Sequence, residues 1–175
     1  MVVITLALVG CGGEGNDGDS GTTPRPDAAK RATTPAGNAP SAVPTTVIGE
    51  IKGPEGIVVT LASAVRDKGG FVTVSGTVAN RGTKPYTPLT WRSKETEMKS
   101  QSSVSGASLI DQAGKKRYLV LRDTDGECLC TTGLVNIRPG ETRSVFAQFP
   151  APPAGVTDVD FQLPTMPSVR IRISG

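Results

Sequence analysis

The stretch "FVTVSGTVAN", residues 71–80, decides the fold, because apolar and polar side chains alternate along it. Valines at positions 72, 74 and 78 fall on one face, and hydroxyl side chains at 73, 75 and 77 fall on the other. A period of two is that of a β-strand with one buried face. Gly76 interrupts the pattern and indicates a bulge. We therefore predict a half-buried strand here, ended by the turn "NRGTKP".

Short runs of the same kind recur on both sides of this stretch, separated by turn residues. "DQAGKK" reads as a hairpin loop, and Pro139 and Gly140 suit the two central positions of a type II turn in "RPGE". No segment keeps a helical period over three turns. The sequence therefore predicts an all-β antiparallel sandwich over residues 56–175. Its other expected strands are residues 57–65, 86–91, 107–110, 117–122, 134–137, 143–149, 159–163 and 169–173.

The last two runs allow a more specific prediction. If "PTMP" closes a hairpin between them, Asp160 falls opposite Arg172 on the outward face. Such an exposed pair of opposite charges across two strands helps to set the register more than it stabilises the fold. The segment from Ser93 to about Ser105 is expected to be a polar loop.

Three segments resemble a known group of proteins. "GTVANRGTKP" and "RPGETRSVFAQFPAPP" resemble the strand-and-turn units of immunoglobulin-like domains in secreted bacterial lipoproteins. "KRYLVLRDTDGECLCT" is similar to a block found in actinobacterial lipoproteins of the secreted-antigen type. The resemblance covers residues 57–173 and implies an immunoglobulin-like sandwich. This group has no established shared activity, so the resemblance assigns no functional residue.

The amino-terminal stretch indicates export. Residues 2–9 are apolar except for Thr5, a run much shorter than the roughly 20 residues of a membrane-spanning helix. "LVGC" resembles the bacterial lipobox, in which cleavage precedes the cysteine and the thiol receives a lipid. We expect residues 1–10 to be a lipoprotein signal peptide and Cys11 to be the lipidated residue. No Lys or Arg precedes the apolar run, which departs from the usual signal peptide.

Residues 11–55 are expected to be a disordered linker, because Gly, Pro, Thr and Ala dominate and large apolar side chains are nearly absent. Such a segment cannot bury enough surface to offset the entropy lost on ordering. The linker would hold the folded part away from a lipid anchor on the outer face of the cell membrane.

Composition excludes several classes of function. The net charge is only +3, and the cations are scattered, which argues against nucleic-acid binding. Histidine is absent, which removes the usual general base, the commonest zinc ligand and every Ser-His or Cys-His pair. We therefore expect a protein that is not an enzyme and has no cofactor.

Cys128 and Cys130 are the first of two local candidates for chemistry. Exported cysteines usually pair, but on a regular strand residues i and i+2 hold their Cβ atoms too far apart for a disulfide. We expect a disulfide that requires a tight turn. Binding of copper(I) by the paired thiolates, an intermolecular bond and a reversible redox pair remain alternatives.

The second candidate is "DTDGE", in which Asp123, Asp125 and Glu127 show the start of the oxygen spacing of a calcium loop. The remaining ligands are missing, so we interpret it as a solvated turn, with calcium as the alternative. "KKR", residues 115–117, reads as a solvated hairpin tip, with an anionic envelope polymer or lipid as the alternative contact.

Taken together, these features predict a lipid-anchored extracytoplasmic module that binds a ligand without catalysis. We expect its partner to be another envelope protein, recognised through edge strands and end loops. The alternative is a copper-binding or thiol-redox protein that uses Cys128 and Cys130.

Overall fold

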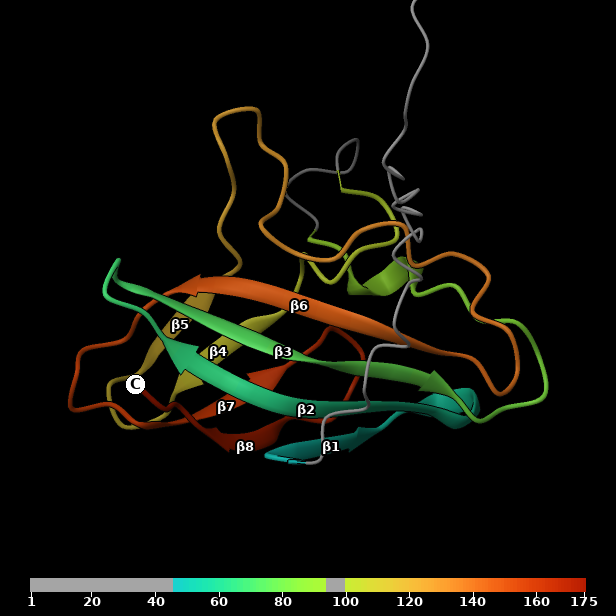
Figure 1. Cartoon of the computed structure of the whole chain (residues 1–175), viewed down its shortest axis with the longest axis horizontal. Coiled ribbons are helices and arrows are strands. Elements are labelled where there is room, and N and C mark those ends of the chain that lie inside the picture. Colours follow the sequence, from blue (N-terminus) through green and yellow to red (C-terminus); the bar gives the residue numbers. More distant parts are fainter. Residues whose placement is uncertain (1–45, 94–99) are drawn as a thin grey trace, which may run out of the picture. The chain divides into compact units, whose positions relative to one another are not determined.

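The computed structural model describes residues 46–93 and 100–175, and this part of the chain is an all-β antiparallel sandwich (Figure 1). One sheet has the strand order β1-β2-β3-β6, and the other has the order β5-β4-β7-β8. The strands are β1 (Gly49–Lys52), β2 (Ile57–Arg66), β3 (Phe71–Asn80), β4 (Ser108–Asp111), β5 (Lys116–Leu119), β6 (Thr142–Pro150), β7 (Asp158–Gln162) and β8 (Val169–Arg172). Two single-turn 3-10 helices, η1 (Pro54–Gly56) and η2 (Leu89–Trp91), complete the described elements.

The predicted sandwich architecture is confirmed, and its strand order differs from that of immunoglobulin constant domains. In immunoglobulin constant domains the sheets have the orders A-B-E-D and C-F-G. Here the first three strands form a meander, and β6 joins them after the chain has built the β4–β5 hairpin of the other sheet.

The alternation in residues 71–80 has the predicted effect. Val72, Val74 and Val78 are buried between the sheets, and the hydroxyl side chains between them are half-buried on the outer face. Phe149 of β6 meets Phe161 of β7 edge-on across the core, with ring centroids 6.5 Å apart. Such T-shaped pairs are favoured because the positive ring edge faces the negative ring face.

The bulge lies on the strand opposite Gly76 rather than at Gly76 itself. The pairing of β2 with β3 shifts between Leu61 and Ser63, so that one extra residue is accommodated in β2. A Cβ atom on Gly76 would lie 2.2 Å from the Thr60 carbonyl oxygen. Glycine is therefore required because the bulged backbone approaches too closely for any side chain.

Two expected strands are not formed. Residues 86–91 contain Pro88, which cannot donate to a ladder, and they end in η2. Residues 134–137 are interrupted by Asn136, whose φ of 51° is incompatible with an extended strand. Only one bridge, between Tyr86 and Ile137, joins the two segments.

The boundary expected at residue 56 is also corrected. β1 lies within the predicted linker 11–55, yet it pairs with β2 in register, with Ile51 opposite Val59 and buried. The four residues of β1 contain a single large apolar side chain. A pattern this short does not distinguish a strand from a linker. The predicted signal peptide 1–10 and Cys11 lie outside the described residues.

Candidate functional site

Cys128 and Cys130 lie beside β6 and cover the edge of its sheet. Thr131 donates its backbone N–H to the Phe146 carbonyl at 2.9 Å, and Gln148 donates to the Leu129 carbonyl at 3.0 Å. Exposed strand edges invite unwanted pairing with other chains, so this segment protects β6.

The two cysteines are joined by a disulfide, with their Cα atoms 5.2 Å apart. A bend at Leu129 provides the tight turn that the sequence required. Both cysteines are buried, whereas the Leu129 side chain between them is 37% exposed. Leu129 is therefore the exposed residue of this segment, and its carbonyl accepts the Gln148 N–H of β6.

The "DTDGE" carboxylates organise a turn instead of converging on one point. Asp123 Oδ1 accepts the backbone N–H groups of Asp125 and Glu127 at 3.0 and 2.9 Å. Glu127 Oε2 accepts the Ser100 hydroxyl at 2.8 Å. Within residues 46–93 and 100–175, no group of three metal-ligating side chains is found. All three carboxylate residues are exposed, and the choice between a solvated turn and calcium stays a prediction.

The carboxyl-terminal half of the predicted polar loop is buried, which sequence reasoning missed. Ser100 Oγ also accepts the Cys128 N–H at 2.9 Å, so this serine connects the loop to the disulfide segment. Ser103 is fully buried and donates to Ser105 Oγ at 2.9 Å. The small residues of "SSVSGAS" were the available signal, because only small side chains fit such a closely packed segment.

The outward face of β2, β3 and β6 carries no charged side chain. Its cross-strand partners are hydroxyl and apolar residues: Ser75 lies opposite both Ser63 and Phe146, and Thr77 lies opposite both Thr60 and Ser144. Phe146 is 43% exposed on this face, on the last strand of the sheet, β6.

The outward face of the other sheet is charged and internally paired. Arg170 Nε lies 3.2 Å from Asp160 Oδ1, and Arg172 Nε lies 3.4 Å from Asp158 Oδ1. "KKR" leads into β5 at the edge of this sheet, and all three of its side chains are exposed. The outward face of the first sheet is therefore uncharged over β2, β3 and β6 and carries the Glu50–Lys52 pair on β1, whereas β7 and β8 carry ion pairs on the outward face of the other sheet.

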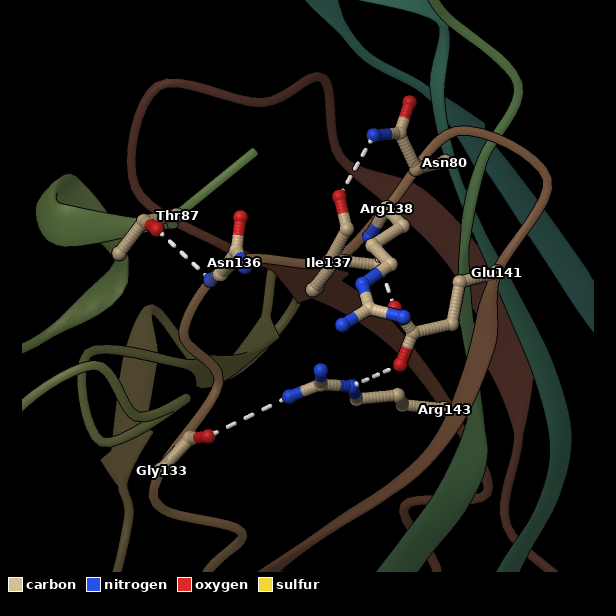
Figure 2. Close-up of polar contacts among 8 residues, drawn as sticks. All are labelled: Asn80, Thr87, Gly133, Asn136, Ile137, Arg138, Glu141 and Arg143. Atoms are coloured by element: carbon tan, nitrogen blue, oxygen red, sulfur yellow. Dashed lines mark hydrogen bonds and ion pairs between the residues drawn. The ribbon is translucent and has the colours of Figure 1, made fainter. Parts of the chain in front are cut away.

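A polar cluster fixes the turn between residues 133 and 143 (Figure 2). Glu141 Oε2 accepts the Arg138 backbone N–H at 2.7 Å, and Oε1 accepts Arg143 Nε at 2.7 Å. The hydrogen bond from Arg143, followed by that from the Arg138 backbone, lowers the pKa of the Glu141 carboxyl below its ordinary value. Gly140 has a φ of 78°, and Glu141 N–H bonds to the Arg138 carbonyl, so the turn predicted at Pro139-Gly140 is present.

Comparisons with protein-family models, with curated proteins and with solved structures found no match for this chain. None of the helices in the described ranges has the length and apolar character needed to cross a bilayer.

Proposed function

We propose that this protein is a lipid-anchored extracytoplasmic binding module without catalysis, related to the immunoglobulin-like lipoproteins that its sequence resembles. The lipobox-like "LVGC" supports the anchor at Cys11, and the linker composition that follows it supports a tethered domain. Two or more acyl chains provide stable attachment to a membrane, whereas one does not.

The proposal that the domain binds a partner rests on the uncharged face of β2, β3 and β6. The centres of protein interfaces are depleted of charged residues and enriched in aromatic ones, because buried charges lose their hydration. Phe146 is exposed on this face, and Leu129 is exposed on the segment that pairs with β6, whereas β7 and β8 carry ion pairs on the outward face of the other sheet. We propose that the partner is another envelope protein that covers Phe146.

A photo-crosslinking residue placed at position 146 in the native host tests this proposal. The control carries the same residue at position 89, because Leu89 is 61% exposed but lies in η2. We expect one envelope protein to be captured from position 146 alone, and the purified pair to associate. The substitution Phe146→Asp should abolish that association, whereas Leu89→Asp should leave it unchanged. Equal capture from both positions, or capture from neither, would refute the docking surface.

The anchor is tested separately by mass spectrometry of the mature amino terminus. We expect a chain that begins at Cys11 and carries a diacylglyceryl group, and we expect Cys11→Ser to prevent this modification. A full-length chain with an unmodified Cys11 in the cytosol would contradict the export proposal, whatever the docking experiment shows.

The alternative function rests on the Cys128–Cys130 pair. A copper or thiol-redox role requires the reduced form, because only free thiolates bind copper(I) or attack a disulfide. Protein purified without reductant would then contain two free thiols that take up one copper ion. A quantitative disulfide and no copper uptake after reduction would remove this alternative.

A further inference from the structure

The β4–β5 hairpin carries three adjacent cations that the proposed function does not use: Lys115, Lys116 and Arg117. All three side chains are exposed, and within residues 46–93 and 100–175 none of them forms an ion pair. Arg117 Nη2 donates to the neutral Gln162 Oε1 at 3.5 Å. The positive charge of the hairpin is therefore available to a partner outside the chain.

The turn that presents these cations is closely built. Asp111 Oδ1 accepts the Gly114 N–H at 2.9 Å, and a Cβ on Gly114 would collide with Oδ2 of the same carboxylate. Lys115 follows with a φ of 52°, in the left-handed region that glycine or asparagine adopts at lower cost. A lysine where the backbone favours glycine points to a role for its charge rather than for the turn.

The carboxylates on the outward face of this sheet do not neutralise the hairpin. The two aspartates of β7 pair with the arginines of β8, with N–O distances of 3.2 and 3.4 Å. Asp111 lies opposite Lys116, but its side chain is buried and its Oδ1 is used within the turn. The surplus positive charge of this face therefore comes from the hairpin.

An exposed leucine lies on the same face as these cations. Arg117 and Leu119 point outward together, because side-chain direction repeats every two residues and Tyr118 between them packs against the core. Leu119 is 49% exposed. Cations beside an exposed apolar side chain suit a lipid surface, where the cations meet phosphates and the leucine enters the interface. A soluble polyanion would use the cations but leave Leu119 in water.

The chain enters the domain beside the sheet that carries this face. Gly49, at the start of β1, packs so closely on β8 that a Cβ there would lie 3.0 Å from Ile171 Cγ2. If Cys11 carries a lipid, residues 12–48 join the anchor to β1, and a flexible chain of this length spans about 30–35 Å on average. Such a tether keeps the domain at a high effective concentration beside the bilayer, so weak contacts suffice for docking.

We propose that the outward face of the second sheet docks on the anionic lipid surface of the membrane that holds the anchor, and this inference rests on the proposed lipidation of Cys11. Lys115, Lys116 and Arg117 contact the lipid phosphates, and Leu119 enters the interface. Docking in this way turns the uncharged face of β2, β3 and β6 away from the bilayer and toward a partner protein.

Energy transfer from Trp91, the single tryptophan, to a dansyl-labelled lipid measures how close the domain lies to a bilayer. The full-length protein isolated from its host is incorporated into vesicles of phosphatidylcholine alone and of phosphatidylcholine mixed equally with phosphatidylglycerol. We expect higher transfer on the mixed vesicles. The difference should disappear between about 0.1 M and about 1 M salt, because the Debye length falls from about 10 Å to about 3 Å.

The decisive variant is Lys115→Gln/Lys116→Gln/Arg117→Gln. Each cation close to an anionic surface strengthens binding about fivefold, so the ratio of docked to undocked domains should fall by about a hundredfold. Leu119→Ser should weaken docking several-fold while the charge is unchanged, because it removes the apolar contact.

The matched control is Arg81→Gln/Lys84→Gln/Arg138→Gln. It removes the same charge from three exposed side chains in the turns where β3 ends and β6 begins, at the other end of the sandwich from the β4–β5 hairpin (Figure 1). We expect its energy transfer on the mixed vesicles to match that of the wild-type protein. Unchanged unfolding midpoints establish that the variants are folded.

Equal transfer on the two kinds of vesicle, or an equal loss in the two triple variants, would overturn the docking face. If soluble poly(glycerol phosphate) displaced the domain and Leu119→Ser had no effect, the cations would serve a soluble polyanion and the lipid surface would be refuted. If the hairpin variant does not fold, the salt dependence and Leu119→Ser decide the question.

Sedimentation with the neutral vesicles reports the anchor separately. Failure of the protein to remain on phosphatidylcholine vesicles would refute the anchor in the proposed function. Retention on both kinds of vesicle with no difference in energy transfer would refute the docking face alone.

Discussion

Asp160 lies directly opposite Arg170 on the paired strands β7 and β8, with Arg170 Nε 3.2 Å from Asp160 Oδ1. The hairpin predicted for these two runs is therefore present, but its register differs by two residues from the predicted pairing of Asp160 with Arg172. Arg172 instead lies opposite Asp158. Both registers keep the same side chains outward, because side-chain direction repeats every two residues. The alternation therefore determined the face, and the length of the connecting turn determined which charges meet.

The acid sensitivity of the fold should depend in part on Asp160. Its pKa is lowered mainly by the Gln112 amide, which donates to Oδ2 at 2.9 Å, and also by Arg170, against the opposing effect of burial. A lowered pKa in the folded state stabilises the protein above the ordinary aspartate pKa of about 4, and that contribution is lost as the pH falls further. Asp160→Asn should therefore cost about 1 kcal/mol at pH 7 and much less at pH 2.

Urea denaturation of the wild-type protein and Asp160→Asn at pH 7, 4 and 2 measures this difference in unfolding free energy. Gln112→Ala is a useful companion, since it removes the main cause of the lowered pKa and leaves Arg170 in place. If the difference in unfolding free energy between Asp160→Asn and the wild-type protein grew toward acid pH, the assignment of acid sensitivity to Asp160 would be contradicted.

The close approach at the β2 bulge predicts different results for two glycine-to-alanine substitutions. Gly76→Ala would place its Cβ 2.2 Å from the Thr60 carbonyl oxygen, so the two strands must separate. We expect a loss of about 2–3 kcal/mol in unfolding free energy, typical of an overpacked interior. Gly155→Ala meets no atom within 4 Å and should be neutral or slightly stabilising, because alanine reduces the freedom of the unfolded chain. Similar unfolding midpoints for the two variants would show that the strands can adjust.

Much of the fold could be predicted from residue alternation, because a half-buried strand shows its period directly. The long strands β2 and β3 were found on this basis to within one residue at either end. β1 was missed because four residues with one buried side chain, Ile51, carry too little pattern. Residues 86–91 were apolar enough for a strand, but Pro88 cannot donate to a ladder and the segment ends in the short helix η2, in which Trp91 is buried.

The site was less predictable, because it depends on contacts between segments distant in the sequence. The disulfide could be foreseen because cysteines of exported proteins usually pair, and the spacing of Cys128 and Cys130 then required a tight turn. The burial of Ser100 could not be foreseen, because its hydroxyl donates to Glu127 and accepts the Cys128 N–H, and both partners belong to another loop.

Reduction of the Cys128–Cys130 disulfide should destabilise the fold only slightly. The bond closes a loop of three residues, and the entropy that such a short loop removes from the unfolded chain corresponds to about 1.5 kcal/mol. Urea denaturation of the wild-type protein with and without a reductant measures the difference, and Cys128→Ala/Cys130→Ala should show no response to the reductant. A loss above about 4 kcal/mol would mean that the bond holds more of the edge segment than the loop length implies.

The buried amide of Asn80 should contribute more to the free energy of unfolding than the disulfide does, because it connects three backbone segments. Its Nδ2 donates to the carbonyls of Lys84 and Ile137, both at 2.8 Å, and its Oδ1 accepts the Gly82 N–H at 2.9 Å (Figure 2 draws the bond to Ile137). The side chain is 1% exposed, so Asn80→Ala removes three hydrogen bonds from a buried position and leaves the Ile137 carbonyl with the Tyr86 N–H as its backbone donor. We expect a loss of about 2–4 kcal/mol in unfolding free energy.

Asn80→Asp separates the two roles of this side chain. The carboxylate can still accept the Gly82 N–H, but it cannot donate to the Ile137 carbonyl and adds a buried charge, so we expect it to be at least as destabilising as alanine near pH 7. Protonation restores one donor, and the difference from the wild-type protein should therefore shrink in acid. The matched control is Asn136→Gly, because Asn136 is exposed and has a positive φ that glycine adopts freely. If Asn80→Ala were as stable as Asn136→Gly, the segment around Ile137 would be held by the Tyr86 backbone bonds alone.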